Sequence, residues 1–458
     1  MSPRARTILA ALLLLAAGAR LRWFSGLQVG DDIVYSKIAA DRAAGLLKFT
    51  NVHEARNGFL LPITAAYALF GPGEVPLVLY NLLCSLGLVA VLFFLARRFW
   101  GETAGGIAGL TAALHPNLLF FATECHTDTP VAFWQALAVL VYLSAPDAKR
   151  LALAGFLVGW AWLHKEHAIF LLPLFAGHAI ARRAWRPLLP LALAALGVFL
   201  AELLFFAVAT GDPFKRFALV KSMHVGHYIA TRYADTGELL YRLFLELPRL
   251  LFAPRRGEYA WAFNLLGLGL GATAVARNAP GARLLAGWWT SIYLSYCFWP
   301  SSLRPFLPSF YLFEWTLPLL AGPLACFCGE GLARRPRWAA AAVMSVAAVA
   351  AVLTAGVQHA RGARFSAGGK EAHAWIERES PGRVVTDDKT IEVLDFLDGH
   401  RPRRTYVPFQ ETKDVAGSVV IVDKFWTQPG QWWTRPGVEP QPSWTKLYES
   451  DRLAIYRP

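Results

Sequence analysis

Two adjacent carboxylates, Asp31 and Asp32, follow the first apolar run of the sequence and could do acid–base chemistry. A carboxylate beside an acceptor hydroxyl can take its proton as a general base, while a second one orients that acceptor or a metal ion. Because adjacent negative charges repel, either the pKa of one carboxyl rises or both groups stay solvated. The alternative is a solvated pair that caps the following helix, since Asp is a favoured N-cap residue. Taken alone, the dipeptide favours the capping role.

A second ionisable cluster centres on Lys165, which is flanked by His164, Glu166 and His167 and bordered by apolar segments. Ionisable groups at membrane depth usually mark a functional site. The alternative is a lysine that extends its ammonium group to the membrane surface and pairs with Glu166.

A metal site is conceivable from the polar segment before residue 130. Its ligands would be Glu124, Cys125, His126 and Asp128, with His164 or His167 brought nearby. The spacing fits no familiar ligand pattern. We therefore assign no metal ligand and no cofactor, and a divalent cation is left as an open alternative.

Three loop cations could contact a sugar or a phosphate. Arg56 and His53 fall in the first polar loop, and Arg304 follows the ninth apolar segment. Arg304 could equally bind membrane lipid headgroups, as cations at a membrane surface do.

The elements that must position these residues are membrane helices. Of the 458 residues, 55% are hydrophobic and 17% are charged, against about 25% charged in soluble proteins. The net charge of +13 could suggest nucleic acid. However, the cations fall in short clusters between apolar runs, and no basic-aromatic nucleic-acid module is present. The composition therefore predicts a membrane protein without a nucleic-acid partner.

The apolar runs predict about eleven transmembrane helices, since a span needs about 20 mostly apolar residues. They lie near residues 7–24, 76–96, 103–121, 128–145, 151–164, 167–181, 187–209, 258–276, 283–299, 308–328 and 338–357. With the N-terminus in the cytoplasm, the predicted inner turns are basic, as the positive-inside rule requires. The C-terminal tail is then extracytoplasmic. We expect interfacial helices near 35–47 and 59–70.

Two domains are expected. Residues 1–360 form the transmembrane core, with a first outer loop at 25–75 and a large outer loop at 211–257. Residues 361–458 alternate between helical and strand-like patterns, which predicts a small α/β domain. Its helices are expected at 371–379 and 390–397, and its strands at 382–386, 405–407, 418–422 and 453–456. Within it, we expect Asp387 and Asp388 to form a surface turn.

The order of these features resembles a known family. The first span ends in Arg20-Leu21-Arg22-Trp23-Phe24, and the acidic pair and two interfacial helices follow. This order resembles the C-type glycosyltransferases, which use lipid-phosphate-linked sugars, and among them the bacterial protein O-mannosyltransferase and aminoarabinose-transferase branch. The resemblance covers roughly residues 1–360. An acidic pair in the first outer loop is that family's catalytic signature, which implies catalytic roles for Asp31 and Asp32.

Further positions carry the resemblance. The matching features are His115-Pro116-Asn117 at the end of the third span, Glu124 to Asp128 at the start of the fourth, Lys165 after the fifth, and the turn Gly211-Asp212-Pro213-Phe214. The family commonly places a carboxylate near Glu124 and Asp128, which implies substrate binding there. The sequence has Asp-Asp where Asp-Glu is common, and Gly58-Phe59-Leu60-Leu61-Pro62 where a Pro-Pro pair is frequent. These departures leave the subfamily and the substrate open.

The resemblance implies a multi-pass enzyme of the cytoplasmic (inner) membrane. Its donor would be a polyprenyl-phosphate-linked hexose or pentose, and its acceptor a hydroxyl of a protein, glycolipid or glycan. One base and a direct displacement predict inversion at the sugar. The alternatives are a transporter or flippase, a glycan polymerase or ligase of the cell envelope, and a non-catalytic scaffold. A transporter would be expected to place carboxylates near the membrane midplane, where the sequence has few besides Glu202 and Glu314.

Overall fold

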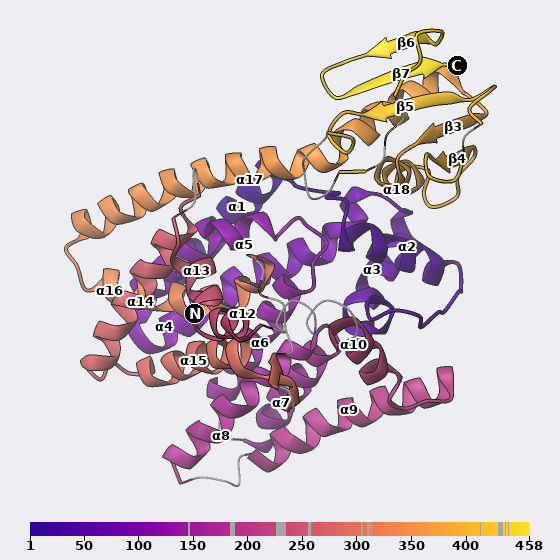
Figure 1. Cartoon of the computed structure of the whole chain (residues 1–458). Coiled ribbons are helices and arrows are strands. Elements are labelled where there is room, and N and C mark those ends of the chain that lie inside the picture. Colours follow the sequence, from indigo (N-terminus) through magenta and orange to yellow (C-terminus); the bar gives the residue numbers. More distant parts are fainter. Residues whose placement is uncertain are drawn as a thin grey trace. The chain divides into compact units, whose positions relative to one another are not determined.

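The structure, a computed structural model, describes residues 1–144, 147–183, 188–225, 235–254, 258–303, 306–308, 312, 314–412, 414–428, 434–435, 437 and 439–458 (Figure 1). The helices up to residue 210 are α1 (Pro3–Arg22), α2 (Asp31–Ala43), η1 (His53–Ala55), α3 (Asn57–Phe70), α4 (Glu74–Leu114), α5 (Pro116–Phe120), α6 (Asp128–Ser144), α7 (Ala148–Trp162), η2 (Glu166–Phe170), α8 (Leu171–Ala181) and α9 (Leu188–Thr210).

The following elements are α10 (Lys215–Val225), α12 (Thr236–Tyr241), η3 (Arg242–Glu246), α13 (Leu247–Phe252), α14 (Ala260–Ala276), α15 (Ala282–Phe298), β1 (Pro300–Leu303), β2 (Phe306–Pro308), η4 (Glu314–Thr316), α16 (Pro318–Ala333) and α17 (Arg337–Glu379). The chain ends with β3 (Arg383–Thr386), α18 (Asp388–Leu397), β4 (Thr405–Pro408), β5 (Val419–Asp423), β6 (Thr445–Glu449) and β7 (Leu453–Arg457).

The chain divides into two compact units. The helical unit consists of Met1–Phe24, Lys48–Leu61 and Tyr80–Val357. The C-terminal unit consists of Ser25–Leu47, Pro62–Leu79 and Gln358–Pro458. The C-terminal unit thus combines the tail with much of the predicted first outer loop, including the helix α2 that begins with the acidic pair.

Long apolar helices dominate the helical unit. Within the described part of the chain, α4, α9 and α17 are each long and apolar enough to cross a membrane. Shorter apolar segments are Asn57–Phe70, Glu166–Ala181, Ala260–Ala276 and Pro318–Ala333. Gly101, with φ 86°, breaks α4 where the sequence predicts a turn between two spans. The predicted total of eleven spans stays a prediction.

Small residues let neighbouring helices of this unit approach closely. A Cβ atom on Gly155 of α7 would lie only 2.0 Å from the carbonyl oxygen of Leu191 in α9. A Cβ on Gly159, one turn later, would meet the side chain of Val198. Small residues serve the same purpose in other membrane helix pairs, because no hydrophobic driving force acts between helices in lipid. The contact fixes α7, whose end leads to Lys165.

A twisted sheet forms the centre of the C-terminal unit. Among the described residues it has the strand order β4-β3-β5-β7-β6, in which β3 pairs parallel with β4 and β5. Strands β7 and β6 extend it in antiparallel fashion. Val384 packs into a core with Trp375 and Ile376 of α17, whereas its neighbour Val385 belongs to a second cluster. This alternation follows from the two-residue period of a strand.

Most of the predicted elements form, with shifted ends. The expected helices near 35–47 and 59–70 are α2 and α3, which begin a few residues earlier. The tail is a mixed α/β fold as predicted, although its first helix is the continuous end of α17 and the edge strand β6 was missed. The expected span at 308–328 begins only at Pro318, because the β1–β2 hairpin and the turn η4 precede it.

Candidate active site

The acidic pair begins α2 in the C-terminal unit. Asp31 is half-buried, whereas Asp32 is 3% exposed. The carboxylate of Asp32 accepts hydrogen bonds from the backbone N–H groups of Gln28 and Gly30, the latter at 2.7 Å. Burial raises the pKa of Asp32, although backbone hydrogen bonds from Gln28, Gly30 and Ile33 oppose the shift. Asp32 is therefore a buried group that holds the turn, and not the solvated side chain of the capping alternative.

The turn before the pair is strained. Val29 has φ 63°, a left-handed conformation that is a true outlier for a β-branched residue. The bonds from Gln28 and Gly30 to Asp32 lie on either side of this residue. Backbone strain of this kind persists where the surroundings impose it, and it is frequent at functional sites. Nothing in the sequence pattern indicated it.

Helix α2 is anchored through Ser36. Its hydroxyl lies 2.7 Å from the Tyr67 hydroxyl in α3 and 2.7 Å from Nε2 of His400, which follows α18. The other ring nitrogen of His400 lies 3.1 Å from Asp395. These bonds connect the acidic helix to the sheet domain within one compact unit.

A buried ion pair occupies the helical unit at the start of α6. Lys165 donates to both carboxylate oxygens of Asp128, at 3.0 and 2.8 Å. His126 and His167 place their Nδ1 atoms 3.3 and 3.6 Å from the same carboxylate. Tyr296 lies 3.1 Å from Nδ1 of His167. The structure thus brings together two predicted substrate-binding residues, Lys165 and Asp128, as partners of one another.

Only some of the conceivable metal ligands come together, with His126 and His167 near Asp128. The ammonium group of Lys165 lies against Asp128, where a cation would bind. His164 instead contacts the Tyr80 hydroxyl at 2.6 Å and the Trp160 carbonyl at 2.8 Å. Cys125 is buried.

A group of side chains with the spacing of a cation site occurs in the C-terminal unit. Within the described ranges, ligand atoms of His373, Glu377 and Asp398 lie within 4.8 Å of one another. Glu377 also accepts from Arg404 and Asp398 from Tyr406, so both carboxylates already have partners. We assign no metal to this group.

Arg216 of α10 forms a network that the sequence interpretation missed. It donates to Glu166 at 2.9 Å and to Glu202 at 2.5 Å, and its guanidinium lies 4.9 Å from the Trp162 ring centroid. Arg216 is 2% exposed. The signal that could have revealed it is Glu202 itself, because a carboxylate within an apolar span requires a cationic partner.

The remaining candidates differ in how well they are placed. Arg56 is 5% exposed and follows η1. The next turn contacts the end of α7, because the Gly58 amide donates to the Leu163 carbonyl at 3.0 Å. His53 and Glu124 are half-buried. Arg304 lies outside the described residues.

The family comparison covers part of the helical unit. Residues 59–210 match the model of the dolichyl-phosphate-mannose-protein mannosyltransferase family. No curated protein matches the chain.

Solved structures with similar folds cover nearly the whole chain. The ArnT of Cupriavidus metallidurans in its apo state matches 98% of this chain and 97% of its own, with a TM-score of 0.65 and 15% identity. The same protein bound to undecaprenyl phosphate matches with a TM-score of 0.60 and 16% identity, over 98% of both chains. The archaeal oligosaccharyltransferase AglB of Archaeoglobus fulgidus, in complex with an inhibitory peptide and a dolichol-phosphate, gives 0.51 and 13% over 93% of this chain and 70% of that one.

The fold is that of the C-type glycosyltransferases. Residues 59–210 match the protein mannosyltransferase family, and nearly the whole chain shares the fold of ArnT and AglB. This finding confirms the resemblance inferred from the sequence. Together with the apolar helices, it makes the chain a multi-pass membrane protein.

Proposed function

We propose that the chain is an inverting glycosyltransferase that uses a polyprenyl-phosphate-linked hexose or pentose. The acceptor is a hydroxyl of a protein, glycolipid or glycan. The observation that carries the proposal is the acidic pair, in which Asp31 is half-buried beside an Asp32 held by backbone amides. The relatives support the donor class, because ArnT has been solved with undecaprenyl phosphate and AglB with a dolichol-phosphate.

Asp31 is the proposed base. The acceptor oxygen forms its bond to the anomeric carbon as the bond from that carbon to the phosphate oxygen breaks. The acceptor proton passes to Asp31, and the electron pair of the broken bond stays on the polyprenyl phosphate. Direct displacement inverts the anomeric carbon. Asp32 holds the turn before α2 and so orients Asp31, which makes it a positioning residue.

Cations of the helical unit are proposed to stabilise the leaving phosphate. Lys165 and Arg56 are the buried candidates, and a fixed cation lowers the cost of the developing charge. Lys165 forms an ion pair with Asp128. His53, Glu124 and Arg304 remain proposed substrate-binding residues.

The reaction is proposed to occur at the outer face of the cytoplasmic membrane. The positive-inside pattern of the turns supports a cytoplasmic N-terminus and an extracytoplasmic tail. A topology assay with a reporter at residue 400 tests this orientation, and a cytoplasmic signal there would overturn it.

The transporter alternative receives less support from the structure. Glu202 is a central carboxylate that such a function could use, but it is bound to Arg216, which also binds Glu166. A carboxylate held by a buried guanidinium is poorly suited to bind a transported cation. The network is better explained as a stabilising contact between α9 and α10.

The test is a transfer assay with purified protein. Radiolabelled polyprenyl-phosphate sugars and a membrane extract are supplied to the wild type and to Asp31→Asn. Asp41→Asn, at the other end of α2, is the matched control. Because adjacent carboxylates can bind hard cations, each reaction is run with EDTA and with added Mg²⁺ or Mn²⁺. A loss of activity with EDTA would show a metal requirement.

We expect transfer by the wild type and by Asp41→Asn, and little by Asp31→Asn. Undiminished transfer by Asp31→Asn would overturn the proposed base. Absence of transfer with every donor, combined with lipid movement across proteoliposomes, would favour the flippase instead.

A further inference from the structure

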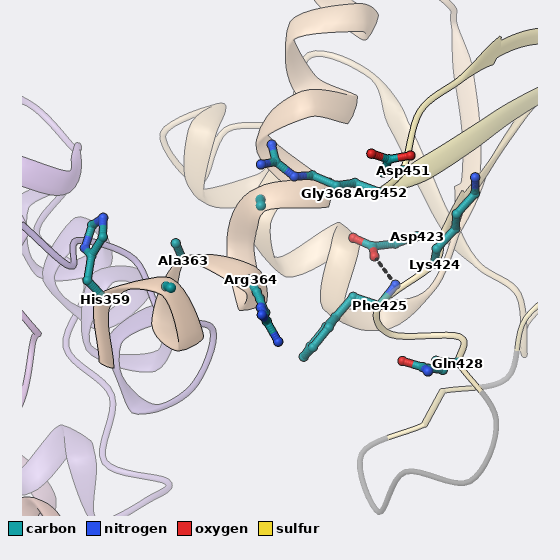
Figure 2. A pocket seen from close by; sticks show the side chains of 12 residues that line it. His359, Ala363, Arg364, Gly368, Asp423, Lys424, Phe425, Gln428, Asp451 and Arg452 are labelled. Carbon is teal, nitrogen blue, oxygen red and sulfur yellow. Dashed lines mark hydrogen bonds between the residues drawn. The ribbon is translucent and has the colours of Figure 1, made fainter. Parts of the chain in front are cut away.

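The C-terminal unit contains a pocket that the proposed reaction does not use. It has a volume of about 810 Å³ and opens between α17 and the loops that follow β5 and β6 (Figure 2). Its polar lining includes Arg364, Asp423, Lys424, Asp451 and Arg452, and Gly368 of α17 lies beside them. All of them belong to the same compact unit.

The pocket lies where an α/β sheet usually binds ligands. After β3 the chain passes through α18 to β4 on one side, whereas β5 pairs with β3 on the other side. Ligands of open α/β sheets bind beyond the carboxyl ends of strands at such a change of direction. Asp423 is the last residue of β5, and Asp387 directly follows β3.

Asp423 has an unused hydrogen-bonding atom. It is 1% exposed, and its Oδ1 accepts from the Phe425 amide at 2.9 Å, the bond drawn in Figure 2. Among the described residues its Oδ2 has no hydrogen-bond partner, although it is buried. Buried polar atoms nearly always have a partner, so an exception calls for an explanation. A hydrogen-bond donor on a bound ligand would give Oδ2 the missing partner.

Two glycines of α17 let that helix lie close to this carboxylate. A Cβ atom on Gly368 would lie 1.9 Å from Oδ2 of Asp423, and a Cβ on Gly369 would strike Val393. Glycine is disfavoured within a helix relative to alanine. Here it permits a close approach of α17 to Asp423 and to α18.

The pocket also presents cations. Lys424 donates to the Ser450 carbonyl and to Glu449, and Arg452 lies 3.8 Å from Glu371. Arg364 is exposed, and no hydrogen bond or ion pair joins it to another described residue. A guanidinium of this kind is suited to the bidentate recognition of a phosphate or carboxylate. The pocket therefore combines a buried acceptor with an available cation.

We propose that this pocket binds an anionic polyol, such as a sugar phosphate or a polyol-phosphate headgroup. A ligand hydroxyl donates to Oδ2 of Asp423, and the anionic group pairs with Arg364. The site goes beyond the proposed function, because its residues are separate from the acidic pair and from the cations assigned to the leaving phosphate. Its ligand could be soluble or lipid-borne.

The test is direct binding to the full chain in detergent. Equilibrium dialysis with radiolabelled glucose 1-phosphate is compared for the wild type, Asp423→Asn and Arg364→Ala. The dialysis is run at pH 8, above the raised pKa of Asp423, so that both side chains are charged. Because a hydrogen bond to a charged group contributes about 1.5–3 kcal/mol, each variant should bind about 10- to 100-fold more weakly. Asp414→Asn and Arg401→Ala replace exposed residues outside the pocket and should bind as the wild type does.

Competition and footprinting identify the ligand class and its place. Glucose 1-phosphate should protect residues 359–368 and 423–428 from hydrogen exchange, and glucose or inorganic phosphate alone should compete poorly. For the lipid source, nanodiscs with phosphatidylinositol are compared with nanodiscs that contain phosphatidylglycerol. Protection by glucose 1-phosphate or by phosphatidylinositol nanodiscs supports recognition of an anionic polyol. Which of the two protects shows whether the ligand is soluble or lipid-borne.

Three results would overturn the proposal. The first is no saturable binding of either probe by the wild type. The second is unchanged binding by both pocket variants, of which Arg364→Ala alters only an exposed side chain and so should stay folded. The third is equal competition by inorganic phosphate, which would show a simple anion site.

Discussion

The hydroxyl of Ser36 lies 2.7 Å from Nε2 of His400, so the helix that begins with the acidic pair is hydrogen-bonded to the C-terminal sheet domain. Ser36 is fully buried and also contacts Tyr67. His400 is in turn held by Asp395. The sheet domain therefore has a structural role in fixing α2, whatever else it binds.

Replacing His400 should loosen α2 and slow transfer. His400 has φ 59°, which Asn tolerates better than Ala does. His400→Asn therefore keeps the turn but is too short to reach Ser36. A buried hydrogen bond contributes about 1 kcal/mol, so we expect faster hydrogen exchange in residues 25–43 and about fivefold slower transfer. His178→Ala removes a comparable contact with Tyr142 in the helical unit and should leave exchange in α2 unchanged. Equal exchange in the wild type and His400→Asn would contradict the role of this bond.

Replacing Asp31 and replacing Asp32 with asparagine should have different effects on transfer and on hydrogen exchange. Asp31→Asn removes the proposed base, so we expect transfer to fall about 100- to 10,000-fold with unchanged exchange in the turn before α2. Asp32→Asn turns an amide group toward the backbone donors of Gln28 and Gly30. We therefore expect reduced transfer together with faster exchange at residues 26–30. If both variants show the same hydrogen-exchange pattern at residues 26–30, the assignment of Asp31 as the base and Asp32 as the positioning residue is wrong.

The buried pair of Lys165 and Asp128 can separate a structural role from a substrate role. Removing one partner leaves a buried charge, which typically costs about 3–5 kcal/mol. Lys165→Met and Asp128→Asn should thus each lower the thermal stability of the detergent-purified protein, and the double variant should regain much of it. If Lys165 binds the donor phosphate, the double variant will still have a raised KM for donor. A double variant with normal KM would show a purely structural pair.

Local patterns in the sequence predicted much of the fold. Long apolar runs with basic turns indicated membrane helices, and α2, α3 and the tail strands β3, β4, β5 and β7 follow from periodicity. Strand β6 was missed because Thr445–Glu449 has weak alternation and lies at the sheet edge. The predicted surface turn at Asp387 and Asp388 was wrong for Asp387. This residue is fully buried and caps α18 by accepting from Thr390, a contact that depends on tertiary packing.

The sequence indicated which residues belong to the candidate site but not which of them pair with one another. Lys165 and Asp128 were both candidate substrate ligands, yet 37 positions separate them, and only the arrangement of α6 and α7 shows that they form one ion pair. Arg216 lies in the predicted large outer loop at 211–257. Its pairing with Glu202 requires knowledge of how α10 lies against α9. The left-handed conformation of Val29 is likewise found in a turn whose flanking amides bond to Asp32, which the local sequence does not indicate.

Asp423 should make the C-terminal unit less stable as the pH rises. Burial, reinforced by the nearby charges of Asp387 and Glu371, raises the pKa of Asp423 from 3.8 to about 7. Between these values the folded state holds the proton and the unfolded chain does not, so stability declines from about pH 4 to about pH 7 and stays reduced above it.

Asp423→Asn carries no charge and avoids this decline. Relative to the wild type, we expect the variant to gain stability between pH 5 and pH 8, with little difference near pH 4. The difference in stability between variant and wild type is measured by thermal unfolding, with hydrogen exchange in β3 and β5 as the readout. Groups other than Asp423 titrate in both proteins, so their contributions cancel in this difference. Asp414→Asn, at an exposed turn, serves as the control and should show no such gain. Parallel stability curves for Asp423→Asn and the wild type across this range would show that Asp423 does not titrate near neutrality.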